Sequence, residues 1–539
     1  MTDIQQSKAA RRGFSVYYKG KTLLSTVDPV AQGERPVRAA PRTERTLYLC
    51  PSPLYGYGLS ALLGDLPLDS AVLCVEADPG LLDLSTQAMQ DLLGNPALGL
   101  IDEINAVDYV RKTWGSRRFR RVEVIHLSGG WQLFPEVYKD IAKKLQQDFA
   151  VDWSNAMTLT KLGRRYILNA VRNLARIPQA RSFGSLAFGD APVLTLGAGP
   201  SLDRVLDALP AGPRPFKIVC VDTALPALKA RNLKPDLAVA LESQHWNLRD
   251  FLGLGDWELP LAMDLSALPA LWDLLGGKTI LFATLWTDLR FFRRLKTAGL
   301  LPEVIPPLGS VGLTAVAAAL RVSSGMVVTA GLDFSYTLDG FHARSTPSHT
   351  ETLNRQSRFR SMLNGDIAFR DGSFTATAKS GETVRTNPAL QFYRDVFERI
   401  FAPEPRLLDI AGPGLALGTR TLSLEEALEV LSKGSSEKPE NDFRDTEKKP
   451  KSAAPFLRRE RDMLIALRDI LTGAIPDDPG TREILLDEAD YLWSHFPDCA
   501  GTGTRRPLGR DVSFLKRVRA EIDPLIRRFN IALETLPSS

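Results

Sequence analysis

Glycines, hydroxyls, carboxylates and imidazoles follow several short apolar runs in the middle of this chain. After the run VLTL (193–196) comes a loop made of Gly197, Ala198, Gly199, Pro200 and Ser201. Glycines let a backbone approach a ligand closely, and free N–H groups at the start of a following helix attract anions. We call residues 197–201 the glycine loop, and its composition makes it a candidate phosphate-binding site.

Further polar residues follow the neighbouring apolar runs FKIVCV, DLAVAL and MVVTA. They are Asp222 and Thr223 after the first run, Glu242 after the second, and Asp333 and His342 after the third. Because apolar runs alternate with helical segments here, we expect a mostly parallel sheet, in which ligands bind beyond the carboxyl ends of the strands. The sequence therefore predicts that these residues gather at one edge of one sheet.

Two segments of this region suit specific chemistry. His342 lies in the loop GLDFSYTLDGFHARS, where an imidazole beside an acid and hydroxyls can act as a general base or acid near neutral pH. In PPLGSVGLTAVAAAL, Ser310 begins a helical run and Thr314 follows one turn later. The N–H groups and hydroxyls at that helix start suit a phosphate or a carboxylate.

Each of these residues also has a purely structural interpretation. Asp222 and Ser310 are typical helix N-caps, Asp333 suits a turn, and Glu242 suits a solvated loop. The glycine loop lacks the last glycine of a dinucleotide-binding GxGxxG motif and the Lys-Ser/Thr pair of a P-loop. No metal site is predicted, and a need for a divalent metal is left open.

The elements that must position these residues fall into four segments of the 539-residue chain. Residues 1–165 show an α/β pattern, and residues 186–432 show a second one with five apolar strand-like runs. Residues 433–455 are charged and almost free of apolar side chains, which is typical of a disordered linker. Residues 456–539 have helical periodicity and predict a small helical domain.

Composition narrows the possible classes of protein. The 67 basic and 63 acidic side chains leave a net charge of +4, which gives no support for bulk nucleic-acid binding. Four cysteines without CxxC spacing argue against a disulfide framework. No secretory signal core and no run of about 18 apolar residues are found, so we expect a cytoplasmic protein without a membrane span.

The first segment offers alternatives of its own. TLYLCPSPLYGYG followed by AVLCVEADP is similar to the opening of a methyltransferase-like Rossmann unit, in which Glu76 would bind a ribose. Because that loop has only two glycines, a docking or scaffold domain is favoured over binding of S-adenosylmethionine or a nucleotide. One basic cluster suits either a solvated strand edge or an anionic partner: Arg117, Arg118, Arg120 and Arg121.

Four segments of the central unit occur in the same order in the motility accessory factor (Maf) family: LGAGPSLD, VDTALPAL, KPDLAVALES and GLDFSYTLDGFHA. TNPALQFYRDVFERI, LLDIAGPGLALGT and the early LLSTVDPVAQGER also resemble that family. Its members are flagellin glycosyltransferases whose central domain is similar to bacterial sialyltransferases. We therefore expect a Rossmann-like N-terminal domain, a central sialyltransferase-like α/β domain and a C-terminal helical domain.

The resemblance implies a reaction and its partners. A nonulosonic acid, of the pseudaminic or legionaminic type, would be transferred from its CMP-activated form to Ser or Thr of flagellin, without a further cofactor. The glycine loop would hold the phosphate and ribose of CMP, and Asp222, Thr223 and Glu242 would contact the nucleotide.

The remaining predicted site residues lie nearer the sugar in this interpretation. Ser310 and Thr314 would lie near the phosphate or the sugar carboxylate. Asp333 and His342 would lie near the reacting centre, with His342 as a base toward the acceptor hydroxyl.

Two other functions remain open on the sequence. The Gly-Pro-Ser signature also resembles archaeal-type 6-hydroxymethylpterin diphosphokinases, in which the loop and the acids would hold ATP and magnesium. The chain could instead be a non-enzymatic flagellin-binding accessory protein with a degenerate site, which its separate helical tail favours.

Overall fold

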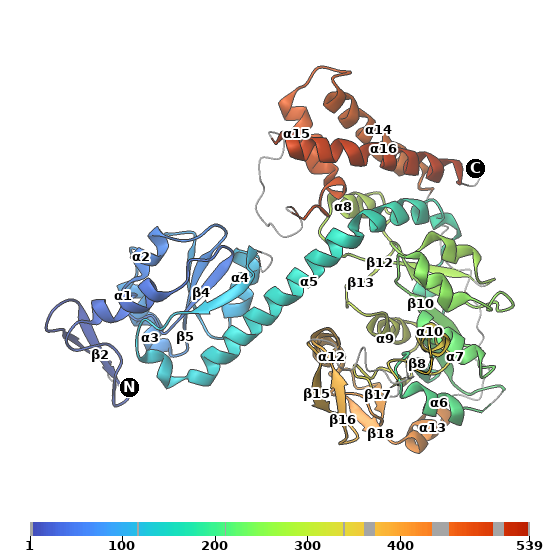
Figure 1. The fold of residues 1–539 in the computed structure, drawn as a ribbon, viewed down its shortest axis with the longest axis horizontal. Coiled ribbons are helices and arrows are strands. Elements are labelled where there is room, and N and C mark those ends of the chain that lie inside the picture. The colour runs from blue at the N-terminus through green and yellow to red at the C-terminus, as the bar shows by residue number, and fades with distance from the viewer. Residues whose placement is uncertain are drawn as a thin grey trace. The chain divides into compact units, whose positions relative to one another are not determined.

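A computed structural model of the chain describes residues 4–115, 118–210, 212–276, 278–337, 340–359, 372–433, 443, 452–497, 499 and 511–536. The chain divides into two compact units (Figure 1). The first is Met1–Lys161 with Trp493–Arg510, and the second is Leu162–Leu492 with Asp511–Ser539.

The first unit contains a four-stranded parallel sheet in the order β6-β5-β4-β7. Its strands are β4 (Thr46–Pro51), β5 (Ala71–Glu76), β6 (Leu98–Asp102) and β7 (Arg121–Val124). Its helices are α1 (Pro29–Ala39), α2 (Leu59–Gly64), α3 (Pro79–Ala88) and α4 (Ala106–Thr113). Every residue of β4 and β5 is buried, as continuous apolar runs predict for central parallel strands. The expected α/β character of this unit is confirmed.

A small antiparallel sheet, β1 (Gln5–Lys8), β2 (Phe14–Tyr18) and β3 (Lys21–Thr22), packs on the loop after β4. Glu76, at the end of β5, is 1% exposed and accepts hydrogen bonds from the hydroxyls of Ser52 (2.7 Å) and Tyr138 (3.0 Å). Hydrogen-bond donors of the protein itself thus occupy the carboxylate that would bind a ribose. This geometry favours the docking or scaffold interpretation of the first unit.

Two arginines of the predicted cluster make side-chain contacts within this unit. Arg118 donates to the Ser70 carbonyl, and the Arg120 guanidinium lies 3.7 Å from the centre of the Trp153 ring. Arg117 lies outside the described residues.

The second unit is built on a nine-stranded sheet in the order β13-β12-β11-β10-β9-β8-β14-β17-β18. The strands are β8 (Val193–Leu196), β9 (Lys217–Val221), β10 (Leu237–Ala240), β11 (Leu261–Asp264), β12 (Thr279–Thr284), β13 (Glu303–Ile305), β14 (Val327–Ala330), β17 (Leu407–Ile410) and β18 (Arg420–Leu422). All neighbouring strands run parallel, which confirms the expected sheet. The strand order reverses at β8, between β9 and β14, and open parallel sheets bind ligands at such a switch point.

Helices and one hairpin surround this sheet. They are α6 (Leu202–Ala208), α7 (Leu225–Lys229), α8 (Arg290–Thr297), α9 (Val311–Val322), α10 (Pro347–Asn354), α12 (Pro388–Phe401) and α13 (Leu424–Ser432), with the antiparallel pair β15 (Phe374–Thr377) and β16 (Thr383–Thr386). α9 packs against β8, β9, β10 and β14, and nine of its twelve residues are buried, as its alanine- and valine-rich sequence predicts.

The long helix α5 (Pro135–Leu174) contributes its last turns to the second unit. Asn169 donates to the carbonyls of Ser243 and Ser266, and Asn173 donates to those of Leu265 and Ala267. Two buried amides therefore hold the turns that follow β10 and β11. This matters for the site because both turns lie at the carboxyl edge of the sheet.

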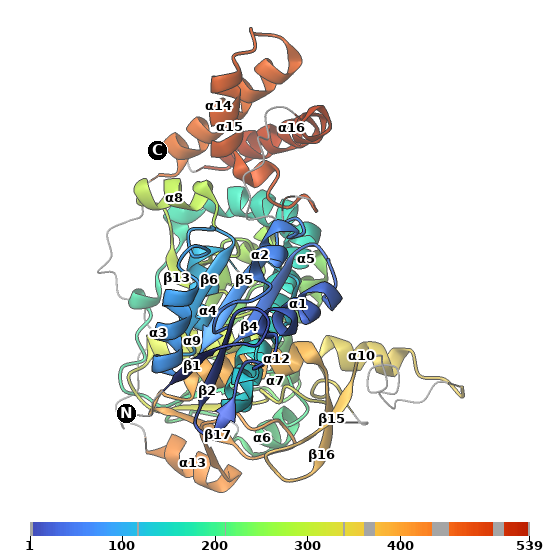
Figure 2. The same cartoon turned by 90° about the vertical axis from the view of Figure 1, so that its left-hand side faces the viewer.

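Three helices form the C-terminal part of this unit: α14 (Ala454–Thr472), α15 (Pro479–Glu488) and α16 (Val512–Glu534). We call them the tail, and both views place it beside α8 (Figures 1 and 2). α14 packs against α16, and Phe291 of α8 contacts the rings of Phe456 and Tyr491. The predicted linker before the tail lies mostly outside the described residues.

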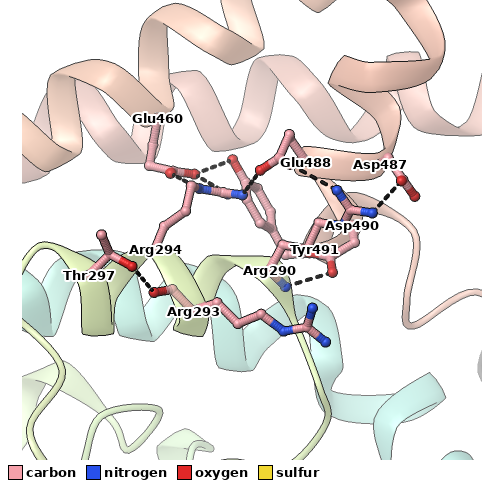
Figure 3. A network of polar contacts seen from close by, with 9 residues as sticks. All are labelled: Arg290, Arg293, Arg294, Thr297, Glu460, Asp487, Glu488, Asp490 and Tyr491. Carbon is pink, nitrogen blue, oxygen red and sulfur yellow. Dashed lines mark hydrogen bonds and ion pairs between the residues drawn. The ribbon is translucent and has the colours of Figure 1, made fainter.

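Charged side chains add to this contact between α8 and the tail (Figure 3). Arg294 binds Glu460 through two hydrogen bonds (2.6 and 2.9 Å) and Glu488 through a third (2.5 Å). The Glu460 side chain is 1% exposed, so this part of the network is shielded from water. Arg290 extends it to Glu488 and Asp487, and its N–H donates to Asp490.

Candidate functional site

The glycine loop is held from within the protein by Asp333, which follows β14. The Asp333 carboxylate accepts a hydrogen bond from the Ser201 N–H (2.8 Å) and another from the Ser201 hydroxyl (2.5 Å). A Cβ atom on Gly199 would lie 2.4 Å from the same carboxylate, so glycine is required at that position. Asp333 is 3% exposed, and this burial raises the pKa of its carboxyl.

Most of the loop's amides are already used by the protein. The Gly197 N–H donates to Ala330, the Gly199 N–H to Gly331, and the Leu202 N–H to Gly199 itself. Ser201 donates to Asp333, as described, and Pro200 has no N–H. Within the described residues, Ala198 keeps the loop's one N–H without an acceptor. The anion position at the start of α6, which the sequence assigns to a phosphate, is therefore taken by a protein carboxylate.

A buried ion pair lies next to Asp333. Lys379 Nζ lies 2.5 Å from an Asp409 oxygen, and these side chains are 5% and 1% exposed. Thr329 donates to the other Asp409 oxygen (2.9 Å). Burial raises the pKa of Asp333, and the positive charge of Lys379 lowers it. Lys379 therefore favours the ionised carboxylate, which accepts both hydrogen bonds from Ser201.

The start of α9 and the glycine loop both pack against one leucine, Leu332. Cβ atoms placed on Gly197 and Gly312 would lie 2.6 and 2.5 Å from the same methyl group of Leu332. Ser310 caps α9 by accepting from the Gly312 N–H (3.3 Å). Thr314 is fully buried, and its hydroxyl donates to the Ser310 carbonyl. Ser310 thus lies at the rim of the site, whereas Thr314 lies beneath it.

His342 is placed against the glycine loop by its neighbour. The Ala343 N–H donates to the Ala198 carbonyl (2.9 Å), and the His342 ring packs edge-on against Phe341. His342 Nδ1 is buried and has no hydrogen-bond partner among the described residues. Burial lowers the pKa of His342 to about 4, so the imidazole is neutral at pH 7.

Ion pairs fix the loop that carries His342. The Arg344 N–H donates to Asp203 (3.0 Å), and its guanidinium pairs with Asp207 (2.8 Å), both on α6. Arg231 binds the same two carboxylates from the turn after α7. His342 is thereby held at a fixed position relative to the helix that follows the glycine loop.

Asp222 and Thr223 belong to a second group of polar residues, at the ends of β9 and β10. Thr223 donates its N–H and hydroxyl to one Asp222 oxygen. Asn247, which is 4% exposed, donates to Asp222 (2.8 Å) and to Asp250 (2.9 Å). Burial raises the pKa of both carboxyls, and the charge of Asp222 raises that of Asp250 further. Glu242 is close enough to raise the pKa of both as well, while it accepts from two backbone amides after β10.

Sequence reasoning missed several residues at this edge. Asn247 and Asp250 stand in the 3-10 helix His245–Phe251, which begins three residues after Glu242. The polar run QHWNLRD was an available signal. Tyr166 comes from α5, and its pKa is raised to about 12 by burial and by Glu242, Asp264 and Tyr393. Nothing local in the sequence connects Tyr166 with this sheet edge.

The predicted residues therefore form two groups at the carboxyl edge of the sheet. The glycine loop, Asp333, Ser310 and His342 lie together at β8 and β14, while Asp222, Thr223 and Glu242 lie together at β9 and β10. Thr314 is buried below the first group. A cavity of about 710 Å³ opens at the opposite, amino edge, where residues such as Asp190, Glu404 and Arg420 line it.

The described residues also bear on two other kinds of site. No three or more histidine, cysteine or acidic side chains in that part of the chain are arranged to hold a metal ion. In the same residues, no helix has both the length and the apolar character needed to cross a membrane.

Comparisons with known proteins agree with this geometry. Residues 167–339 match the family model described as 6-hydroxymethylpterin diphosphokinase MptE-like. An uncharacterised protein of Treponema pallidum (strain Nichols) is 29% identical over 560 residues, which cover 98% of this chain and 95% of that protein. The structure titled Maf glycosyltransferase from Magnetospirillum magneticum AMB-1 superposes with a TM-score of 0.53 at 15% identity, covering 98% of this chain and 92% of that chain.

The family match and the structural likeness confirm the resemblance and the fold class that the sequence predicts. The likeness extends beyond the central sheet, because nearly the whole of both chains is covered. This chain has the fold of a Maf glycosyltransferase along almost its entire length, and it carries an MptE-like family segment at residues 167–339.

Proposed function

We propose that the protein is a glycosyltransferase that moves a nonulosonic acid from a CMP-activated donor to Ser or Thr hydroxyls of flagellin, in the cytoplasm. The observation that carries the proposal is the position of His342, which lies on a loop bonded to Ala198 at the switch point of the sheet. Among the residues that the structure describes, its Nδ1 has no hydrogen-bond partner. The Maf glycosyltransferase likeness supports the same reaction class.

His342 has the protonation state that the reaction needs. A neutral imidazole can accept the proton of a Ser or Thr hydroxyl while the hydroxyl oxygen attacks the anomeric carbon. The new carbon–oxygen bond forms as the bond between that carbon and the phosphate oxygen breaks, and CMP leaves with the electron pair. The donor brings a phosphate and a carboxylate, and their negative charge raises the pKa of a nearby imidazole toward neutrality.

The protein offers the donor two places for its negative groups. Among the described residues the Ala198 N–H of the glycine loop has no acceptor, and the first amides of α9 follow Ser310. Helix starts of this kind attract anions through their free N–H groups and the helix dipole. Asp222 and Thr223, at the neighbouring strand end, are then left for the nucleoside. No metal or further cofactor is part of this proposal.

A direct test uses purified full-length protein, a CMP-nonulosonate and recombinant unmodified flagellin, with intact-mass spectrometry as the readout. His342→Gln should abolish the mass increase, because an amide cannot take the proton. His245→Gln is the matched control, since His245 is exposed at the same sheet edge, and it should keep full transfer. Unchanged transfer by the His342 variant would contradict the role of this residue.

A phosphotransferase is the second candidate, because the family model that matches residues 167–339 is that of a pterin diphosphokinase. The carboxylates at the ends of β9 and β10 would then face ATP and magnesium. A thermal-shift comparison of CMP, CDP, ATP with magnesium and S-adenosylmethionine separates the two functions. Stabilisation by ATP and magnesium alone would favour phosphoryl transfer, and no response to any nucleotide would favour a flagellin-binding accessory protein.

A further inference from the structure

The cavity of about 710 Å³ lies at the amino edge of the nine-stranded sheet, the edge opposite the candidate site. Residues just before or at the starts of four neighbouring strands line it: Pro192 at β8, Met326 at β14, Leu407 at β17 and Arg420 at β18. Because neighbouring strands lie about 4.8 Å apart, these starts span about 14 Å. Small-molecule sites in proteins have volumes of roughly 300–1,000 Å³, so this cavity has the size of one.

Apolar side chains from the sheet and from α13 form part of the lining. Leu407 and Leu422 are 2% and 3% exposed, and Met326 and Val430 line the same space. The core of the sheet holds these leucines in place, and a ligand that covers them removes apolar area from water. The lining therefore suits the apolar body of an organic molecule.

Two hydrogen-bond donors without acceptors line the cavity at the start of β18. The Thr419 hydroxyl oxygen is buried and has no hydrogen-bond partner among the described residues. Arg420 follows it directly and is exposed, and its guanidinium forms no ion pair or hydrogen bond within that part of the chain. A buried hydroxyl without a partner is costly, and a guanidinium binds an oxyanion through paired hydrogen bonds. One oxyanion at this place can accept from both side chains.

The other charged side chains of the lining favour an anion at β18 rather than at β8. Lys433 of α13, which packs against β18, adds a positive charge, and its ion pair with Glu429 (3.0 Å) is exposed and therefore weak. Glu404 already binds Arg406, whose Nε donates to it (3.0 Å). Asp190, before β8, has no partner among the described residues, so it repels a negative group at that end.

Glu426 of α13 does not take the place of an anionic ligand. The Ser423 N–H donates to its carboxylate (2.7 Å) and lowers the pKa of Glu426, and the charge of Arg420 lowers this pKa further. Arg420 thus acts on Glu426 through space, without an ion pair. Its guanidinium keeps its donors for a ligand.

We propose that this cavity binds an amphipathic organic anion with a single oxyanion group. The oxyanion binds Thr419 and Arg420, and the apolar body lies along the starts of β17 and β14. An anion with a second negative group meets Asp190 and is disfavoured. The cavity and the glycine loop lie at opposite edges of the sheet, so this site does not rest on the proposed transfer reaction.

The test is a fluorescence titration of the full-length protein with anilinonaphthalene sulfonate, which has an aromatic body and one anionic group. Phenyl-naphthylamine, the same body without the sulfonate, is titrated in parallel. Arg420→Gln should weaken sulfonate binding about tenfold and Thr419→Val about two- to tenfold, with little change for the uncharged probe. Arg399→Gln, an equal loss of charge at an exposed position of α12 outside the cavity lining, should change neither.

A larger side chain in the cavity tests where the probes bind. In Val430→Trp the indole occupies part of the cavity, so both probes should bind more weakly. Arg420 is exposed and valine has nearly the shape of threonine, so the other two variants are expected to fold. Equal sulfonate affinity in the native protein, Arg420→Gln and Val430→Trp, or no sulfonate binding at all, would overturn the proposal. An equal loss of both probes in Arg420→Gln would overturn it too, because the anionic group would then play no part.

Discussion

The Asp333 carboxylate binds Ser201 through both the backbone N–H (2.8 Å) and the hydroxyl (2.5 Å), although 132 residues separate them. This double hydrogen bond joins the loops after β8 and β14, the two strands on either side of the switch point. Asp333 thereby holds the shape of the glycine loop.

Replacing Asp333 tests this role. Asp333→Asn leaves only one oxygen to accept from two donors, so we expect a loss of about 1–3 kcal/mol in the free energy of unfolding. Chemical denaturation of the full-length protein measures it. Asp273→Asn, at an exposed carboxylate, should cost less than about 1 kcal/mol. Equal stability of the two variants would show that the bond to Ser201 contributes nothing.

Gly199 should tolerate no side chain. In Gly199→Ala the new Cβ atom would lie 2.4 Å from the Asp333 carboxylate and 2.8 Å from the Gly331 carbonyl. We expect a strongly destabilised or insoluble protein. Gly255→Ala, at a position with open space around the added carbon, should express and unfold normally. A stable Gly199→Ala protein would contradict the packing of these loops.

His342 should make both stability and activity sensitive to acid. Its pKa of about 4 in the folded protein lies below the ordinary value of 6.5, so the unfolded chain takes up the proton first as pH falls. Stability is therefore lost between about pH 6.5 and 4, and His342→Gln should lose less over this range. For the free enzyme, the acidic limb of kcat/KM should lie nearer pH 4 than pH 6.5. A limb centred at pH 6.5 would mean that the imidazole is solvated.

Glu76 should give the opposite pH dependence in the first unit. Burial raises its pKa to about 7, so the unfolded chain ionises first as pH rises. The neutral carboxyl contributes its full stabilisation below about pH 4.5. This contribution, roughly 3 kcal/mol, is lost as the pH rises to about 7. Glu76→Gln should therefore be more stable than the native protein at pH 8 and not at pH 4.5. Unfolding curves of both proteins at both pH values test this. A stability difference between variant and native protein that is the same at pH 4.5 and pH 8 would contradict it.

Neighbouring arginines of α8 should differ sharply in their contribution to stability. Arg294 pairs with Glu460, which is 1% exposed, whereas the partners Arg293 and Asp288 are 65% and 75% exposed. Arg294→Met leaves a buried carboxylate unpaired and should cost about 3–5 kcal/mol. Arg293→Met should cost less than about 1 kcal/mol. Denaturation midpoints compare the two, and similar losses would indicate that water reaches Glu460.

Changing both partners sharpens that comparison. Arg294→Met combined with Glu460→Leu removes the unpaired charge, so most of the lost stability should return. Failure of the double variant to recover would show that the loss comes from packing around Phe291 rather than from the charge.

The fold was predictable where the sequence has continuous apolar runs. Central strands such as β8 and β9 are buried on both faces, and their sequences contain no polar alternation to obscure them. β11 was missed because its four residues, LAMD, end in an acid and carry no strong strand signal. The long helix α5 was missed although its terminal turns hold the turns after β10 and β11.

The candidate site was predictable in its location but not in its internal bonding. The rule for parallel sheets places the residues after β8, β9, β10 and β14 at one edge, and they lie there. Which carboxylate binds the glycine loop depends on a contact between loops 132 residues apart. No local sequence pattern indicates that Asp333 binds the Ser201 N–H, which the sequence assigns to a phosphate. Nor does one indicate that Asn247 donates to both Asp222 and Asp250.

The strand order has a consequence for how the protein is synthesised. β9 follows β8 closely along the chain, but β14, on the other side of β8, emerges from the ribosome much later. Adding the 132 residues between Ser201 and Asp333 takes on the order of 10 s at typical translation rates. Until then one edge of β8 has unpaired backbone groups, and the nascent chain is open there to chaperones or to pairing with another copy. Slow codons placed before residue 333 should therefore increase aggregation more than slow codons placed after β18.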